Sequence, residues 1–275
     1  HLSIRRQRQM CIRDSPMPEP LKSSDLPDAL LPAKRRADGI ALIEGYRHVG
    51  EALQGVWKPL GLLLGPTFKA TNEALELVNI AVKINCPLLY PPERIMRRLG
   101  DVDTSPQVAL ALAPPPTTRE LPTVMPDRLL ILDGVSDPGN AGTLLRTARA
   151  FGATVILCGG GVSLLNEKFL RASAGTAFGE GAVYSLLSTA EVSAYLKSHQ
   201  HPTLVLEADR GEDLRKIGEP KRWALVVGSE ARGPDVAAWS GVRRIRIPMS
   251  VGVESLNAAV SGALALYELS RNELP

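Results

Sequence analysis

The side chains best suited to chemistry are polar residues placed at the ends of apolar segments. Asn257 lies near the start of the segment 255–270, which is apolar on almost every face at 3.6 residues per turn. Only Asn257, Ser261 and Glu268 share its narrow polar stripe. Such a helix is expected to be nearly buried, with Ser255 as its N-cap. A buried amide costs free energy without a hydrogen-bond partner, so Asn257 is either a satisfied core amide or part of a site.

A second polar group opens the predicted helix 141–151. Asn140 follows Asp137-Pro138-Gly139 and has the side chain of an N-cap. Arg146 and Arg149 lie opposite the apolar face of this helix. Arginines in such places are solvated surface or phosphate ligands, and the pattern alone leaves both open.

A third group, Gly228-Ser229-Glu230, follows the apolar run 225–227. Glycine at the end of a strand permits close approach of a ligand to the backbone, although a plain turn also explains it.

Other candidate sites fail on spacing. Gly159-Gly160-Gly161 follows a strand but has Leu164 where a dinucleotide loop needs its third glycine. The histidines 48, 199 and 201 have no carboxylate or cysteine partner at ligand spacing, so we expect no metal site.

The elements that position these residues alternate between strands and helices. Strands are predicted at 129–132, 154–157, 183–187, 204–207, 225–227 and 243–247, and helices at 141–151, 167–172, 190–198 and 256–270. This alternation predicts an α/β fold with a mainly parallel sheet covered on both faces. Ligands of such sheets bind beyond the carboxyl ends of the strands, where 228–230 and 249–254 fall.

The segment 113–126 holds five prolines in fourteen residues and is predicted to be an extended spacer between two domains. Before it, 17–112 form a smaller α/β domain, and after it 127–275 form the larger one. Within the first domain, strands are predicted at 40–44, 60–64, 87–90 and 107–113, and helices at 46–53, 72–79 and 93–99. Residues 1–16 are predicted to be a non-native head, with a disordered RNA-binding arm as the alternative.

Bulk properties fit a globular protein without a membrane span. Apolar residues make up 44% of the 275 residues and charged ones 22%, and no apolar run approaches the roughly 18 residues that a span needs. The three cysteines lie far apart, which favours a reduced, cytoplasmic location. The whole net charge of +3 lies in the arginine-rich head, so any affinity for nucleic acid would have to come from local patches.

Taken together, Asn140–Gly152, Leu225–Pro234 and Ile247–Ser261 resemble the three signature motifs of the SpoU (TrmH-like) ribose 2′-O-methyltransferases of the SPOUT class. The likeness covers roughly residues 128–271 in order and includes Lys168–Gly175. It implies S-adenosylmethionine as the cofactor and transfer of a methyl group to a ribose 2′-hydroxyl in RNA.

The resemblance assigns roles residue by residue. Arg146 would engage the reacting ribose, and Asn140, Glu230, Ser255 and Asn257 would complete the active site. The backbone around Gly228, Ile247 and Leu256 would cradle S-adenosylmethionine. Lys168 and Arg171 would lie near RNA, and Arg35 and Arg36 are added as basic candidates for phosphate contact, as are the basic groups at 94–98 and 243–246.

The resemblance also implies a C-terminal trefoil knot and a homodimer. The pattern Glu44-Gly45…Val49-Gly50-Glu51 is similar to the L30e-like RNA-binding domain that precedes many SpoU domains, which favours rRNA over tRNA, although Gly45 and Glu51 are also explained as a turn and a surface residue. The alternative functions are a non-catalytic RNA-binding or ribosome-assembly protein with the same fold, and a SPOUT base methyltransferase.

Overall fold

The computed structural model describes residues 37–99, 106–218, 220–235, 237–239 and 241–271. Arg35, Arg36 and the head 1–16 lie outside the described residues. Contacts divide the chain into two compact units: residues 1–116 with 165–180, and residues 117–164 with 181–275. The division near residue 116 falls inside the proline-rich segment, which contains a 3₁₀ turn, η1 (Pro116–Arg119), rather than extended chain throughout.

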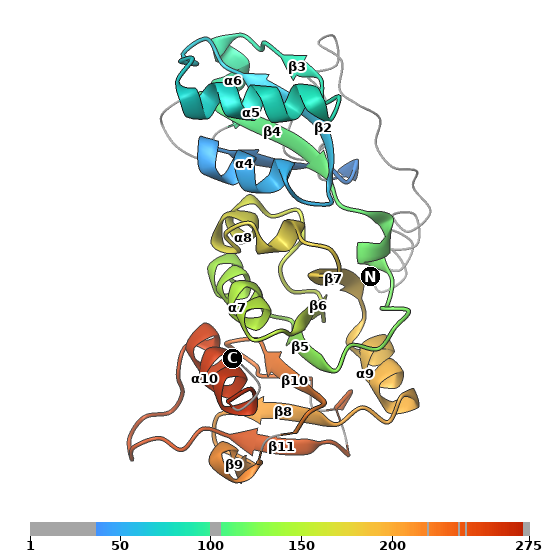
Figure 1. Cartoon of the computed structure of the whole chain (residues 1–275). Coiled ribbons are helices and arrows are strands. Elements are labelled where there is room, and N and C mark those ends of the chain that lie inside the picture. The colour runs from blue at the N-terminus through green and yellow to red at the C-terminus, as the bar shows by residue number, and fades with distance from the viewer. Residues whose placement is uncertain (1–36, 100–105, 219, 236, 240, 272–275) are drawn as a thin grey trace. The chain divides into compact units, whose positions relative to one another are not determined.

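Unit 1 is built on a mixed sheet of order β1-β4-β2-β3 (Figure 1). β4 pairs antiparallel with both β1 and β2, whereas β2 and β3 are parallel. Its core is aliphatic, because β4 and the second half of β2 are buried throughout. The elements are β1 (Ala41–Glu44), α4 (Tyr46–Leu53), β2 (Lys58–Leu64), α5 (Asn72–Lys83), β3 (Leu88–Leu89), α6 (Glu93–Leu99), β4 (Val108–Ala113), α8 (Glu167–Ala172) and η2 (Thr176–Phe178).

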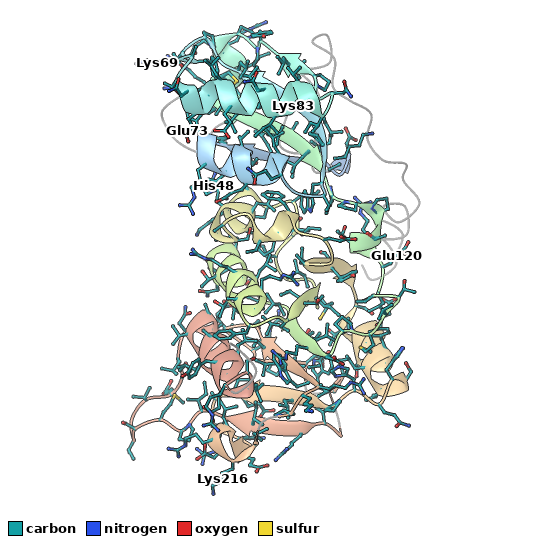
Figure 2. The ribbon with its side chains drawn as sticks, viewed as in Figure 1. His48, Lys69, Glu73, Lys83, Glu120 and Lys216 are labelled. Atoms are coloured by element: carbon teal, nitrogen blue, oxygen red, sulfur yellow. The ribbon has the colours of Figure 1, made fainter. Side chains whose placement is uncertain are left out.

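Helix α5 shows how local chemistry fixes an element. Thr71 caps it by accepting a hydrogen bond from the Ala74 N–H. Glu73 lies in its first turn and Lys83 in its last, at opposite ends of the helix, where each charge complements the helix dipole (Figure 2). The helix runs to Lys83, four residues beyond the predicted end at Asn79.

The segment 165–180 packs within unit 1 although it lies between two strands of unit 2 in the sequence. Phe178 meets Trp57 edge to face at 5.2 Å between ring centroids, and its carbonyl accepts from the Val56 N–H at 2.8 Å. Gly175 adopts a φ of +81°, and a Cβ there would meet the Glu51 side chain at 2.9 Å. The segment therefore turns sharply against α4.

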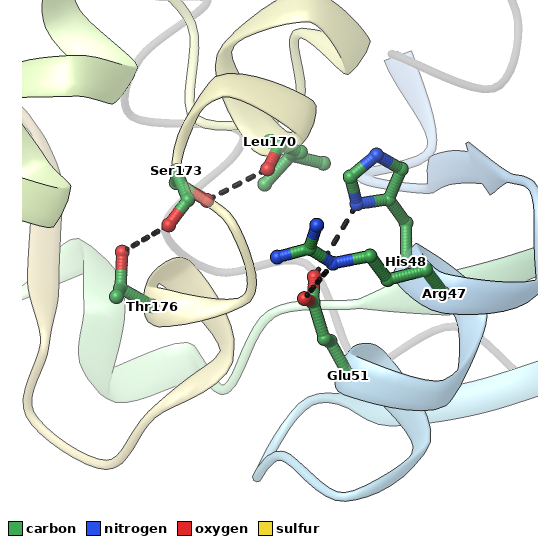
Figure 3. A network of polar contacts seen from close by, with 6 residues as sticks. All are labelled: Arg47, His48, Glu51, Leu170, Ser173 and Thr176. Atoms are coloured by element: carbon green, nitrogen blue, oxygen red, sulfur yellow. Dashed lines mark hydrogen bonds and ion pairs between the residues drawn. The ribbon is translucent and has the colours of Figure 1, made fainter.

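Figure 3 shows the polar side of this packing. Glu51 accepts hydrogen bonds from Arg47 Nε at 3.1 Å and is 3.3 Å from His48 Nδ1. In the turn opposite, the hydroxyl of Ser173 donates to the Leu170 carbonyl and that of Thr176 to the Ser173 carbonyl. The bond from Ser173 thus gives a partner to a carbonyl in the last turn of the short helix α8.

Unit 2 confirms the predicted parallel α/β architecture. Seven of its described strands form one sheet of order β7-β6-β5-β10-β8-β11-β9, and every strand pair in it is parallel. Its elements are β5 (Arg128–Asp133), α7 (Pro138–Ala150), β6 (Thr154–Cys158), β7 (Val183–Leu187), α9 (Thr189–Ser198), β8 (Thr203–Glu207), β9 (Glu212–Asp213), η3 (Leu214–Lys216), β10 (Trp223–Gly228), β11 (Arg243–Arg246) and α10 (Ala258–Leu269).

Helix α10 packs against α7 and β10, and Gly262 makes this approach possible. A Cβ on Gly262 would lie 2.4 Å from Leu144 Cδ2 on α7 and 3.4 Å from Val227 Cγ2 on β10. The prediction that α10 is nearly buried was wrong on one face, however. Val260, Leu264 and Tyr267 are 49%, 46% and 56% exposed in the single chain.

Two buried cysteines give a prediction about reactivity. Burial raises the pKa of the Cys86 thiol to about 11, and burial together with the nearby Asp133 carboxylate raises that of Cys158 far above its usual range. Because the thiolate is the reactive form, both should resist Ellman's reagent at pH 8 in the folded protein and react once guanidinium unfolds it. Rapid modification of either residue in the native protein, located by mass spectrometry, would contradict this burial.

No helix in the described part of the chain combines the length and apolar character needed to cross a lipid bilayer.

Candidate functional site

The three predicted motifs meet at the carboxyl ends of the central strands of unit 2. β10 ends at Gly228, and β5, its neighbour in the sheet, leads into α7 and Asn140. α10 begins close by, because the chain that leaves β11 returns to pack α10 on β10. Residues more than one hundred positions apart thus share one edge of the sheet, the edge at which ligands of parallel sheets bind.

Asn140 is the centre of a hydrogen-bonded chain that joins all three motifs. Its amide nitrogen donates to Glu230 Oε1 at 2.8 Å, and its amide oxygen accepts from Asn257 Nδ2 at 3.1 Å. Asn257 in turn caps α10, since its oxygen accepts from the Ala259 and Val260 N–H groups. The three side chains therefore fix one another's orientation. Their bonds also determine which terminal atom of each asparagine amide is the nitrogen and which is the oxygen.

The helix caps differ from those predicted. Asn257, not Ser255, is the N-cap of α10. Asp137, not Asn140, caps α7, and its carboxylate accepts from the Asn140 backbone N–H at 2.7 Å. These shifts have a functional consequence, because capping by Asp137 leaves the whole side chain of Asn140 available to the other two motifs.

A cavity of about 650 Å³ lies beside this chain. Its lining contains the predicted cofactor residues Gly228, Ile247 and Leu256, together with Glu230, Ser255 and Asn257. Apolar walls come from Leu206, Val227, Met249 and Ala258. The volume and the mixture of apolar walls with a few polar groups suit a nucleoside-sized ligand such as S-adenosylmethionine.

Gly228 begins a closed turn, Gly228–Pro234, on one side of the cavity. A Cβ on Gly228 would lie 2.0 Å from the Pro234 nitrogen, so no side chain fits there. The Gly233 N–H donates to the Ser229 carbonyl at 2.9 Å, and the Arg232 N–H donates to Ser229 Oγ at 3.2 Å. We call this segment the cavity turn, and it carries Glu230.

Arg146 is exposed on α7, six residues after Asn140 and about 120° around the helix from it. In the described residues it makes no hydrogen bond or ion pair, and it does not join the chain formed by Asn140, Glu230 and Asn257. Lys168 is exposed and Arg171 half-buried on α8, which belongs to unit 1.

The arginines of β11, considered from the sequence as phosphate contacts, are engaged within unit 2. Arg243 pairs with Glu212 at 2.7 Å, Arg244 with Glu207 at 2.6 Å, and Arg246 donates to the Gly211 carbonyl. Their charge is thus largely matched by neighbouring strands and loops. The pair Glu207–Arg244 also lines the cavity, which the sequence pattern did not single out.

Asp133 is a further residue that the pattern missed. The predicted strand stopped one residue short of it, at Leu132. In the structure β5 includes Asp133, and this residue is buried, with only 4% of its surface exposed. A charged residue directly ending an apolar strand was the available signal. Among the described residues, no group of three or more His, Cys, Asp and Glu side chains is arranged to hold a metal ion.

Comparison with known proteins connects this site to a family. Residues 127–267 match the model of the SpoU rRNA Methylase family. A 23S rRNA (guanosine(2553)-2′-O)-methyltransferase of Bacillus subtilis is 30% identical over 230 residues, which cover 83% of this chain and 87% of the relative. A 23S rRNA (adenosine(1067)-2′-O)-methyltransferase of Streptomyces azureus is 35% identical, but the match spans only 52% of this chain and 55% of that protein.

Solved structures agree over most of the chain. The SpoU methyltransferase AviRb from Streptomyces viridochromogenes, in complex with AdoMet, superposes with a TM-score of 0.76 at 25% identity, covering 88% of this chain and 94% of that one. A putative TrmH-family RNA methyltransferase from Porphyromonas gingivalis gives a TM-score of 0.74 at 26% identity. With its motifs joined at one cavity and more than half its length matched, the chain belongs to the SpoU rRNA methylase family.

Proposed function

We propose that this protein transfers the methyl group of S-adenosylmethionine to a ribose 2′-hydroxyl of RNA. The hydrogen-bonded chain of Asn140, Glu230 and Asn257 at a nucleoside-sized cavity is the observation that carries the proposal. The named relatives modify 23S rRNA, and AviRb was solved with AdoMet, which supports both substrate and cofactor. Ribosomal RNA is therefore preferred to tRNA as the substrate, and the cytoplasm is the proposed location.

The residues of this chain would act mainly by placing the reactants. S-adenosylmethionine, when bound, supplies an electrophilic methyl group. Gly228, Ile247 and Leu256 would hold it in the cavity. Asn140 and Asn257, which are hydrogen-bonded to each other, would orient the ribose against it together with Ser255. Orientation of two bound reactants can supply about 7–11 kcal/mol of the barrier.

Arg146 is proposed to engage the ribose oxygen and the negative charge that develops there. A guanidinium group holds its protons tightly and is therefore a poor base, so positioning and charge are the main contributions of Arg146. Lys168 and Arg171, with the sequence candidates Arg35 and Arg36, are proposed as contacts to the RNA backbone. These contacts would make binding weaken as salt rises.

A direct test uses methyl-labelled S-adenosylmethionine with rRNA and tRNA in separate reactions, followed by alkaline hydrolysis. Label in alkali-resistant dinucleotides from rRNA is expected, because a methylated 2′-oxygen cannot attack the adjacent phosphate. Label on bases would support a base methyltransferase. Label in tRNA alone would show that tRNA, and not rRNA, is the substrate. RNA binding without any transfer would support a non-catalytic role.

We further propose that two copies assemble through α10. Val260, Leu264 and Tyr267 are spaced by four and three residues and form one exposed apolar stripe. A second copy would bury this stripe and would also bring a partner's Arg146 within reach of the cavity. That arrangement accounts for an Arg146 that makes no bond in its own described chain.

The α10 stripe yields a prediction about assembly. Leu264→Glu places a charge in the proposed interface, and it should shift the protein from dimer to monomer at micromolar concentration. Activity should fall about 100-fold or more, since a site that needs both copies is lost. Light scattering after size exclusion measures the mass, and Val82→Glu on the exposed face of α5 is the matched control. A wild-type monomer with full activity would rule out this assembly.

Family membership supports two further proposals about the fold. We propose that the C-terminal segment is knotted, supported by the path from β11, on the far side of β8, back to α10 on β10. We also propose that unit 1 is an L30e-like RNA-binding domain, supported by its mixed sheet with Gly45 at the β1–α4 turn, where φ is +86°.

A further inference from the structure

The carboxylate of Asp133 is buried and accepts hydrogen bonds from four separate donors. Two reach Oδ2: the Asp235 N–H at 2.8 Å and Trp239 Nε1 at 2.9 Å. The other two reach Oδ1: Thr189 Oγ1 at 2.5 Å and Cys158 Sγ at 3.9 Å. No lysine or arginine of the described residues bonds to it, so neutral donors alone compensate this buried group.

The two oxygens of Asp133 serve different parts of unit 2. Oδ1 is bonded to two regular elements, at the start of helix α9 and at the end of strand β6. Oδ2 is bonded only to residues that follow the cavity turn, since Asp235 comes directly after Pro234 and Trp239 four residues later. One side chain therefore connects the rigid sheet with the segment that leaves the cavity turn.

The other end of the same turn is also held at Asp133. Gly228 pairs with Asp133 in the parallel ladder between β10 and β5. The turn is closed on itself by the bridge between Ser229 and Gly233, so fixing its two ends fixes its shape. Its residues Gly228, Ser229, Glu230 and Gly233 line the cavity.

Burial of a carboxylate is unfavourable unless its hydrogen bonds are specific and complete, and an apolar residue would serve packing alone as well. We infer that Asp133 is a positioning residue, which holds the cavity turn in the shape that binds S-adenosylmethionine. The inference rests on the proposed function, because the ligand of the cavity is the cofactor named there. Asp133 is not among the residues that line the cavity, so it would act through the backbone of the turn.

The test compares bonds to the two oxygens by calorimetric titration with S-adenosylmethionine. Trp239→Phe keeps an aromatic ring and removes a bond to Oδ2, whereas the nearly isosteric Thr189→Val removes a bond to Oδ1. Trp239→Phe should raise Kd about tenfold, a change that corresponds to about 1.4 kcal/mol, and Thr189→Val should change it by less than about threefold. At saturating cofactor kcat should stay within about threefold in both, so the effect appears in KM.

Variants of Asp133 itself separate geometry from charge. Asp133→Asn can turn its oxygen toward Asp235 and Trp239 and donate its NH₂ to Thr189 Oγ1, so Kd should rise less than about fivefold. Asp133→Ala removes every bond and should raise Kd at least about 30-fold if the variant folds. The Trp239→Phe comparison does not depend on that variant.

His201→Asn controls for a loss of stability alone. His201 is also buried and hydrogen-bonded, to the Pro126 carbonyl at 3.0 Å, but it precedes β8 at the amino end of the sheet. This variant should lower Tm and leave Kd unchanged. Equal Kd values for Trp239→Phe and wild type, or equal losses in Trp239→Phe and Thr189→Val, would overturn the inference. Failure of the wild-type protein to bind the cofactor would instead overturn the proposed function, and the inference with it.

Discussion

Replacement of Arg146 by alanine is expected to lower kcat at least about 100-fold and to leave the Kd for S-adenosylmethionine within about twofold. Arg146 is exposed, makes no bond in the described chain and does not line the cavity of its own chain, so we expect its loss to disturb neither folding nor cofactor binding. Its proposed partner, the ribose oxygen, is present only when RNA is bound. Single-turnover methylation and calorimetry measure the two quantities separately.

Arg149→Ala is the matched control, because Arg149 is also exposed on α7, three residues further along. Its kcat should stay within about threefold of the wild-type value. Equal losses in both variants would show a general effect of charge on RNA affinity and would remove the catalytic role from Arg146.

Mixed dimers determine which copy supplies the arginine. A dimer of one Arg146→Ala chain and one Asn140→Ala chain contains one intact site if Arg146 acts on its partner's cavity. The same dimer contains two defective sites if Arg146 acts on its own. Recovery of about half the wild-type rate per dimer would support action across the interface.

Asn140→Ala should reduce kcat/KM about 100-fold with little change in Tm. The substitution breaks both bonds of the central amide, to Glu230 and to Asn257, so these side chains lose their mutual orientation. Stability should be retained because Asp137 caps α7 through the backbone N–H of residue 140, which any residue supplies. Steady-state kinetics and thermal melting provide the two measurements.

Asn140→Asp sharpens this test. It retains an acceptor for Asn257 but places a carboxylate against Glu230 Oε1, 2.8 Å from the present nitrogen, where like charges repel. We expect it to be no more active than Asn140→Ala. Thr143→Ala, at an exposed position one turn along α7, is the control and should be near normal. An Asn140→Asp protein with wild-type kcat/KM would show that the donor to Glu230 is dispensable.

The architecture of unit 2 could be predicted because its strands and helices are strongly patterned. Residues 129–132 and 225–227 are continuous apolar runs, typical of strands buried on both faces, and both are central in the sheet. Order along the chain then placed Gly228 at the carboxyl end of a strand. The convergence of Asn140, Glu230 and Asn257 came from family resemblance, since no spacing rule states which side chains bond across 90 and 117 residues.

The remaining features depend on tertiary context. Ser255 is as good a cap as Asn257 by residue type, and only the path of the chain after β11 decides between them. The apolar residues of α10 suggested burial by its own chain, because hydrophobicity does not say whether a helix is covered by its own core or by a partner. Asp133 escaped notice because its four donors come from two distant segments and a neighbouring strand end.

The grouping of residues 165–180 with unit 1 has a consequence for how such proteins can diverge. Because Phe178 and Gly175 pack against Trp57 and Glu51, a gene fusion that exchanged only the N-terminal stretch would leave an internal loop without its complement. A new N-terminal module would have to arrive together with a matching change between β6 and β7. Recombination at a single point is therefore disfavoured, and the two regions should be inherited as a set.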